Sequence, residues 1–171
     1  LQTGSEIMTR KRVLLCSLLL SLLYVIPIAV FNKGLNGADL SFHLNRLLGM
    51  EGIYASPINF KAFYGIGLGV NYFYPFLTYY PFFVLYRLFH SVFLGYYIYQ
   101  YLLTILTFLI AYYSISNIMV NEDKENKKDF AGLLFATFYT FSLYRLDNIV
   151  IRFATGEFIA YAFIPLVFYG L

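Results

Sequence analysis

The sequence predicts an all-α protein, a polytopic bundle of transmembrane helices with about four to five membrane segments and an external amphipathic helix at the membrane interface. The 171 residues are 60% apolar and 12% charged, and their mean hydropathy is +0.67. Soluble domains are typically about 25% charged and leave roughly 30% of their unfolded surface exposed after folding. A soluble domain of this length therefore could not hide so many apolar side chains. Several apolar runs also approach the length of about 20 residues that spans a bilayer.

Composition excludes several other classes of protein. The high apolar content is incompatible with intrinsic disorder. A single cysteine, Cys16, excludes a disulfide scaffold and zinc sites built on paired cysteines. The formal net charge is +3 and the basic residues are scattered, so nucleic acid is not an expected partner.

The first span is expected at Val13 to Phe31, which contains no charged residue. Residues 1–7 precede Met8 and are interpreted as a cloning remnant, which leaves residues 8–171 as a single transmembrane domain. No convincing small-residue cleavage site ends the apolar run, so we interpret it as an uncleaved anchor. The Arg10-Lys11-Arg12 cluster before it predicts a cytoplasmic N-terminus.

A polar external segment, Asn32 to Tyr72, should follow and contain a helix. Leucines recur there at helical spacing, and polar residues form the neighbouring stripe. The apolar stripe is Leu40, Leu44, Leu47 and Leu48, and the neighbouring stripe is Asp39, His43, Arg46 and Met50. This pattern is typical of an amphipathic helix that lies in the membrane interface. The glycines at 65, 67 and 69 indicate a flexible loop, because no Gly-Lys-Ser/Thr follows them.

The later segments are less uniform. Residues 72–89 are apolar but contain two prolines, so they form either a kinked span or a re-entrant piece. Residues 91–119 and 130–144 are expected to span, with a solvated loop at 121–129 between them. Residues 158–171 are apolar but short for a span, which suggests that the chain ends within a helix of a larger membrane domain.

Charge does not settle the sidedness of residues 120–157. Whether or not residues 72–89 cross, six lysines and arginines lie on each side of the membrane. The positive-inside rule therefore does not orient any segment beyond the first span.

Asp39 and His43 form the clearest candidate for a reactive pair. Four residues apart, they share one face of a helix close to the end of the first span. A carboxylate beside an imidazole can take a proton from a hydroxyl, and Arg46 could hold a phosphate through forked hydrogen bonds. The alternative is a solvated helix face with Asp39 as its N-cap. The pair could also hold a divalent metal, but a third ligand is not evident.

Two other groups of residues could bind a substrate. Arg145, Arg152 and Glu157 lie between apolar segments and could form an anion site; alternatively they are snorkelling side chains, with Glu157 at a helix N-terminus. Tyr72 and Tyr74 are typical of an interfacial aromatic belt, although tyrosines can also stack on sugars or line a groove for a lipid tail.

The order of these features resembles the GT-C superfamily of polytopic membrane glycosyltransferases. The resemblance lies in the basic N-terminus, the single first span and the early external acid of Gly-Ala-Asp-Leu-Ser-Phe-His at 37–43. The bacterial YfhO-like branch is similar in two further motifs. These are Asn-Tyr-Phe-Tyr-Pro at 71–75 and the tail Tyr-Arg-Leu at 144–146, Arg-Phe-Ala-Thr-Gly-Glu-Phe-Ile-Ala at 152–160 and Ile-Pro-Leu at 164–166.

The resemblance implies the N-terminal part of a multi-pass enzyme of the bacterial cell membrane. Such an enzyme transfers a sugar from a polyprenyl-phosphate carrier to a cell-envelope acceptor outside the cytoplasm. The family's catalytic base is an acid of the first external loop, which corresponds here to Asp39. Many members carry a second acid beside it, whereas this chain has Leu40, and metal dependence is therefore in doubt.

Two other functions stay open at this point. One is a transporter or a lipid-handling membrane subunit, which should place charges or broken helices near mid-membrane and show an inverted repeat. The other is a non-catalytic helical module that assembles with a partner chain. We interpret the charges of this sequence as lying at span ends and find no repeat in it.

Overall fold

The computed structural model describes residues 10–32, 35–119 and 125–171, and over these ranges it is all-α, with no strand. An isolated bridge between Asn59 and Leu68 is the only extended pairing in the described chain. The α-helices are α1 (Arg10–Phe31), α2 (Leu40–Gly49), α3 (Val70–Phe73), α4 (Tyr80–Phe89), α5 (Val92–Ile118), α6 (Glu125–Thr140), α7 (Leu143–Asp147) and α8 (Thr155–Gly170). Short 3₁₀ turns occupy Met50–Gly52 and Phe63–Gly65, and a π-helix occupies Asn148–Arg152.

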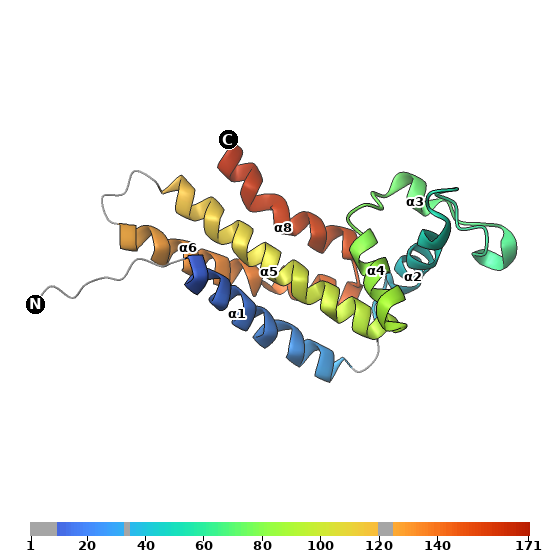
Figure 1. Ribbon diagram of the computed structural model, residues 1–171, viewed down its shortest axis with the longest axis horizontal. Helices are drawn as coiled ribbons and strands as arrows, with labels where there is room; N and C mark the ends of the chain where they lie inside the picture. The colour runs from blue at the N-terminus through green and yellow to red at the C-terminus, as the bar shows by residue number, and fades with distance from the viewer. Residues whose placement is uncertain (1–9, 33–34, 120–124) are drawn as a thin grey trace, which may run out of the picture.

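The long helices lie side by side along the longest axis of the molecule, and the short ones gather at one end (Figure 1). Helix α5 is central and packs against α1, α4, α6 and α8. Helices α1 and α6 run toward the end that holds α2, α3 and α4, and α5 and α8 run away from it. We call this end the α2 end.

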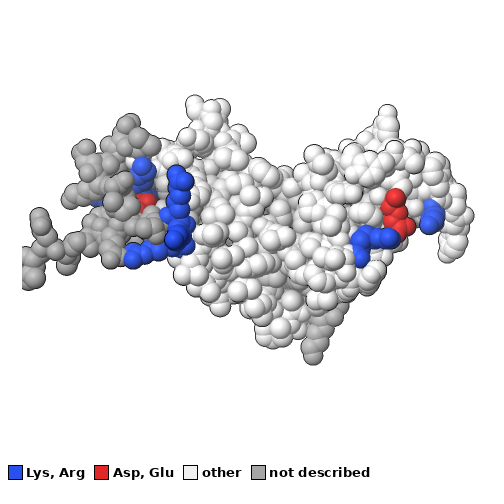
Figure 2. Space-filling view, in the orientation of Figure 1, with Lys and Arg blue, Asp and Glu red and all other residues white. Residues whose placement is uncertain are grey.

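Among the residues that the structure describes, two helices are long and apolar enough to cross a membrane, α1 with 22 residues and α5 with 27. They confirm the helices predicted at 13–31 and 91–119. Helices α6 and α8 have 16 residues each, so length and composition alone do not establish four to five spans. On the face shown in Figure 2, the charged side chains gather at the two ends, and the surface between them has none.

The segment 72–89 does not traverse the bundle. Its helix, α4, has 10 residues and is therefore about 15 Å long, half the thickness of a bilayer core. The turn into α5 is tight: His90 adopts a left-handed conformation with φ 51°, and the Ser91 hydroxyl caps α5 by accepting a hydrogen bond from the Leu94 amide. The segment 72–89 therefore contains no helix of spanning length.

The loop predicted at 121–129 is partly wrong. Residues 120–124 lie outside the described residues, but α6 begins at Glu125, so residues 125–129 are helical. Charged residues there are compatible with a helix because straight-chain Glu and Lys have good helix propensity. Asp129 is fixed to the neighbouring helix by a 2.8 Å hydrogen bond from the Tyr112 hydroxyl.

Aromatic side chains dominate the core near the α2 end. The rings of Phe153 and Tyr96 stack with centroids 4.4 Å apart, and Phe82 stacks on Tyr99 at 5.7 Å. This cluster joins α4 and α5 to the segment between α7 and α8, and it thereby fixes the residues next to the start of α8.

Candidate functional site

The site forms where the chain before α2 meets the chain before α8. The Ala38 and Asp39 amides donate hydrogen bonds to the carbonyls of Ile151 and Arg152, at 3.2 and 2.9 Å. Gly37 makes this close approach possible: its φ is 154°, and a Cβ there would lie 2.5 Å from the Cβ of Phe153. Two segments far apart in the sequence are thus joined through their backbones.

Asp39 lies at the N-cap position of α2, but its side chain accepts no capping hydrogen bond. The structure thus does not support the interpretation of Asp39 as a capping residue. The half-buried side chain instead borders a pocket of about 480 Å³. The pocket is lined by Asp39, Phe42, His43, Tyr74, Ala154, Gly156, Glu157 and Ala160.

The polar stripe of α2 is not a solvated face, which corrects that alternative. His43 is 4% exposed and Arg46 is 2% exposed, because this stripe packs against the start of α8 and the chain around α3 and α4. His43 Nδ1 lies 2.7 Å from Thr155 Oγ1 and 3.3 Å from Arg46 Nη1. Because a guanidinium can only donate, Nδ1 accepts, and this assigns the ring proton to Nε2.

His43 is consequently a neutral imidazole. Burial first, and then the neighbouring Arg46 charge, lower the pKa of His43 to about 3. A histidine with this pKa is a weak base at neutral pH, and its acceptor nitrogen is already occupied. The geometry therefore favours a role for His43 in orienting Arg46 and Thr155.

Arg46 is a buried cation surrounded by neutral groups. Its guanidinium carbon lies 4.5 Å from the ring centroid of Tyr79 and 5.1 Å from that of Tyr74. It donates to Asn71 Oδ1 and to the Pro75 carbonyl, both at 3.4 Å, which is longer than a usual N–H···O hydrogen bond of about 3 Å. Burial lowers the pKa of Arg46.

A second pocket, of about 250 Å³, adjoins Arg46. Its walls come from the chain between α3 and α4 and from one face of α8. The lining residues are Arg46, Tyr74, Pro75, Thr78, Gly156, Ile159, Ala160 and Phe163. No carboxylate is hydrogen-bonded to Arg46 within the described ranges, and a bound anion could therefore supply the missing counter-charge.

Arg152 is a less available cation because Glu157 already neutralises it. Its two terminal nitrogens each donate to a Glu157 oxygen at 2.6 Å, and the Tyr144 hydroxyl donates to Glu157 at 2.7 Å. The Glu157 hydrogen bond, and to a smaller degree the charge of Asp39, raise the pKa of Arg152. Asp39 and His43 from one predicted group thus line the same pocket as Glu157 from the other, while Arg46 lines the adjoining pocket.

Arg145 lies elsewhere. It is fully buried in the bundle, where it donates to Thr104 Oγ1 at 2.8 Å and to the Thr140 carbonyl at 3.3 Å. Its guanidinium carbon lies 5.0 Å from the ring centroid of Tyr24. Arg145 therefore neither snorkels nor lines either pocket.

The two tyrosines of the 71–75 motif also separate. Tyr74 lines both pockets, whereas Tyr72 is 72% exposed and lines neither. Thr155 is a site residue that sequence reasoning missed. Its contact with His43 joins positions 112 residues apart, and no local pattern marks such a pairing.

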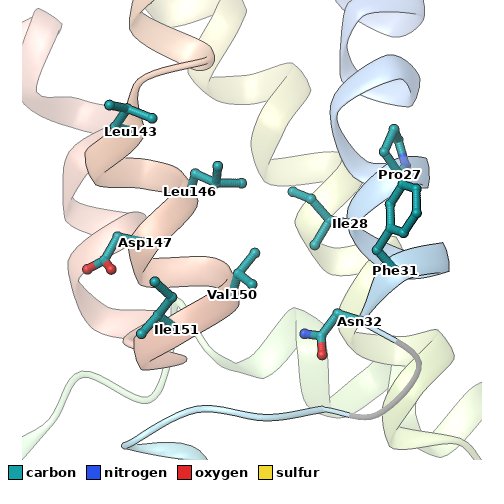
Figure 3. Close-up of a pocket in the computed structure, with 9 residues that line it drawn as sticks. All are labelled: Pro27, Ile28, Phe31, Asn32, Leu143, Leu146, Asp147, Val150 and Ile151. Atoms are coloured by element: carbon teal, nitrogen blue, oxygen red, sulfur yellow. The ribbon is translucent and has the colours of Figure 1, made fainter.

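A third hollow of about 610 Å³ lies between the end of α1 and the α7–π-helix segment (Figure 3). Its lining is Pro27, Ile28, Phe31, Asn32, Leu143, Leu146, Asp147, Val150 and Ile151. In Figure 3 the Asp147 carboxylate points away from α1, so the walls that face each other are almost entirely apolar. With no cation in its lining, this groove lacks the chemistry of the pocket beside Arg46.

No family model, no curated protein and no solved structure matches this chain. Across the described ranges, no group of three or more His, Cys, Asp or Glu residues could hold a metal ion. The described part of the chain is thus a helical protein with two helices long and apolar enough to cross a membrane and a polar pocket at one end of its bundle.

Proposed function

We propose that this chain is the N-terminal membrane portion of a GT-C-type, YfhO-like bacterial glycosyltransferase. It transfers a sugar from a polyprenyl-phosphate carrier to a cell-envelope acceptor. One observation carries the proposal: the Asp39 side chain, which makes no capping bond, borders a pocket that adjoins the buried cation Arg46. A base beside an uncompensated cation is what transfer from a phosphate donor requires.

The reaction is a direct displacement. The acceptor hydroxyl oxygen forms a bond to the anomeric carbon of the sugar, and its proton passes to the Asp39 carboxylate. The bond between the anomeric carbon and the phosphate oxygen breaks, and its electron pair leaves with the carrier phosphate. Arg46 stabilises the charge that develops on that oxygen, while His43 and Asn71 hold the guanidinium in place.

The proposed setting is the cell membrane, with the N-terminus in the cytoplasm and the α2 end outside. The basic residues Arg10, Lys11 and Arg12 start α1 at the opposite end of the bundle. The charge-free surface between the two ends supports the same arrangement (Figure 2). Further helices of a larger chain, a lipid-linked donor and the bilayer are the expected partners.

The proposal is tested by sugar transfer in membranes that contain the full-length protein. Radiolabelled sugar on a polyprenyl-phosphate donor is offered to the wild type and to Asp39→Asn, which keeps the shape of the side chain and removes the base. We expect a loss of at least about 100-fold, the usual contribution of a general base. Asp147→Asn, at the same end but in the apolar groove, is the matched control. Undiminished transfer by Asp39→Asn would remove Asp39 from the mechanism.

A second candidate is a transporter or lipid-handling subunit, and Arg145 is the observation that favours it. Arg145 is a buried cation that donates a hydrogen bond to Thr104 and lies over the ring of Tyr24. Buried cations of this kind mark substrate paths through membrane bundles. If the wild type transfers no sugar from several donors, and Arg145→Gln alters uptake of an anion into proteoliposomes, this second function replaces the first. A non-catalytic module would show neither activity.

A further inference from the structure

The Asp39 pocket and the Arg46 pocket meet along one face of α8. Both are lined by Tyr74 on one side and by Gly156 and Ala160 on the other. Besides Glu157, the α8 residues in the two linings are Gly156, Ile159, Ala160 and Phe163, whose spacing of three and four places these four on one side of the helix. They extend over about 10 Å of helix.

Gly156 has no packing reason to be glycine. A Cβ at this position would meet no atom within 4 Å, and its φ lies outside the range that strains other residues. Gly95 is a useful contrast, because a Cβ there would lie 2.9 Å from the backbone nitrogen of Tyr86, so close helix packing requires that glycine. The space at Gly156 is open, and a glycine with open space beside it permits close approach of a ligand.

The lining changes in polarity along α8. Asp39 and Glu157 border the pocket at the start of the helix, and Arg46 borders the next pocket. Ile159 and Phe163 follow along α8, which runs away from the α2 end (Figure 1). A ligand that matches this order carries hydroxyl groups at one end, an anion in the middle and an apolar chain at the other end.

We propose that Gly156 and Ala160 set the width of one continuous cleft against Tyr74 and so determine which ligands enter. The cleft takes an aliphatic phosphate ester, with the phosphate at Arg46 and the chain along Ile159 toward Phe163. The inference deepens the proposed function. Only the placement of a sugar near Asp39 depends on that function, whereas the cleft and its phosphate ester do not.

A binding experiment tests the cleft without requiring catalysis. In full-length protein that carries Cys16→Ser and Ala160→Cys, maleimide labelling of the exposed position 160 is followed with farnesyl phosphate, farnesol or inorganic phosphate. We expect farnesyl phosphate to slow labelling, and the other two to do so at least about tenfold less effectively, because each lacks one half of the matching chemistry. Arg46→Gln should lose the protection by farnesyl phosphate.

Gly156→Leu should block the cleft and also abolish protection, and the smaller Gly156→Ala should reduce it. Gly170→Leu is the matched control: it lies in the same helix, and a Cβ there also meets nothing within 4 Å. Labelling that farnesyl phosphate does not slow, or protection that survives Gly156→Leu, overturns the inference. Protection without sugar transfer would reject the proposed enzymatic function and support the cleft. Sugar transfer without protection would support the enzymatic function and reject the cleft.

Discussion

Protonation of His43 should destabilise the folded protein in a defined pH range. The pKa of the buried imidazole is lowered to about 3, below its ordinary value of 6.5, so the unfolded chain binds more protons between these two values. The stability that the neutral ring contributes is therefore fully present above pH 6.5 and is lost as pH falls toward 3. At pH 5 the loss is about 2 kcal/mol relative to pH 7.

For a chain of this size, that loss corresponds to a fall in melting temperature of about 4–8 °C. The measurement is thermal unfolding of the full-length protein in detergent at pH 7 and at pH 5, for wild type and His43→Gln. The substitution lowers stability at both pH values but should remove most of the difference between them. His90→Asn is the matched control, since His90 is exposed and asparagine tolerates its left-handed conformation.

Carboxylates also titrate toward pH 5, but they are common to all three proteins, so the comparison isolates the imidazole. Equal pH dependence in wild type and His43→Gln would refute the assignment of a neutral, buried His43. Loss of the pH dependence in His90→Asn would refute it as well.

Three further outcomes follow from the same structure. Gly37→Ala should cost about 1–3 kcal/mol and weaken ligand binding, because its φ of 154° and the 2.5 Å approach to Phe153 exclude a Cβ; an unchanged melting temperature would contradict this. Gly95→Ala should destabilise by about 1–3 kcal/mol through a clash with the α4 backbone while leaving the cleft intact, which thermal unfolding and the farnesyl phosphate assay check together. In a cysteine-free background, Lys61→Cys should react with an impermeant maleimide from outside intact cells and Lys127→Cys only after permeabilisation; the opposite pattern would invert the proposed topology.

Most helix positions could be predicted from the sequence because charge-free runs are local signals. Arg10–Phe31 and Val92–Ile118 coincide closely with the predicted apolar segments. The structure of residues 72–89 could not be predicted, because apolar content does not distinguish a short helix at one end of a bundle from a kinked span. The structure gives this segment the short helix α4, which packs on α5.

The sequence marked Asp39, Arg46, Glu157 and Tyr74 as candidates but did not predict how they are arranged. The structure places all four around one pair of adjoining pockets. The alternative that the polar stripe of α2 faces solvent was wrong. Helical periodicity separates two stripes but does not say which of them is buried. His43 and Arg46 turn inward since Thr155, Asn71 and the Pro75 carbonyl satisfy them there, and these partners come from distant segments.

The two buried arginines differ in a way that assigns them different roles. Each lacks a hydrogen-bonded carboxylate within the described ranges, and a buried cation without one is costly. Arg145 donates to Thr104 at 2.8 Å inside the bundle and borders neither pocket, so it is not placed to contact a ligand bound beside Asp39. Arg46 makes only long hydrogen bonds of 3.3–3.4 Å and borders an open pocket, so an anion can reach it and replace weak contacts with stronger ones. In the proposed function, the free energy released when an anion pairs with Arg46 supplies the affinity at this site, and Asp39, which lines the adjoining pocket, acts on what the anion carries.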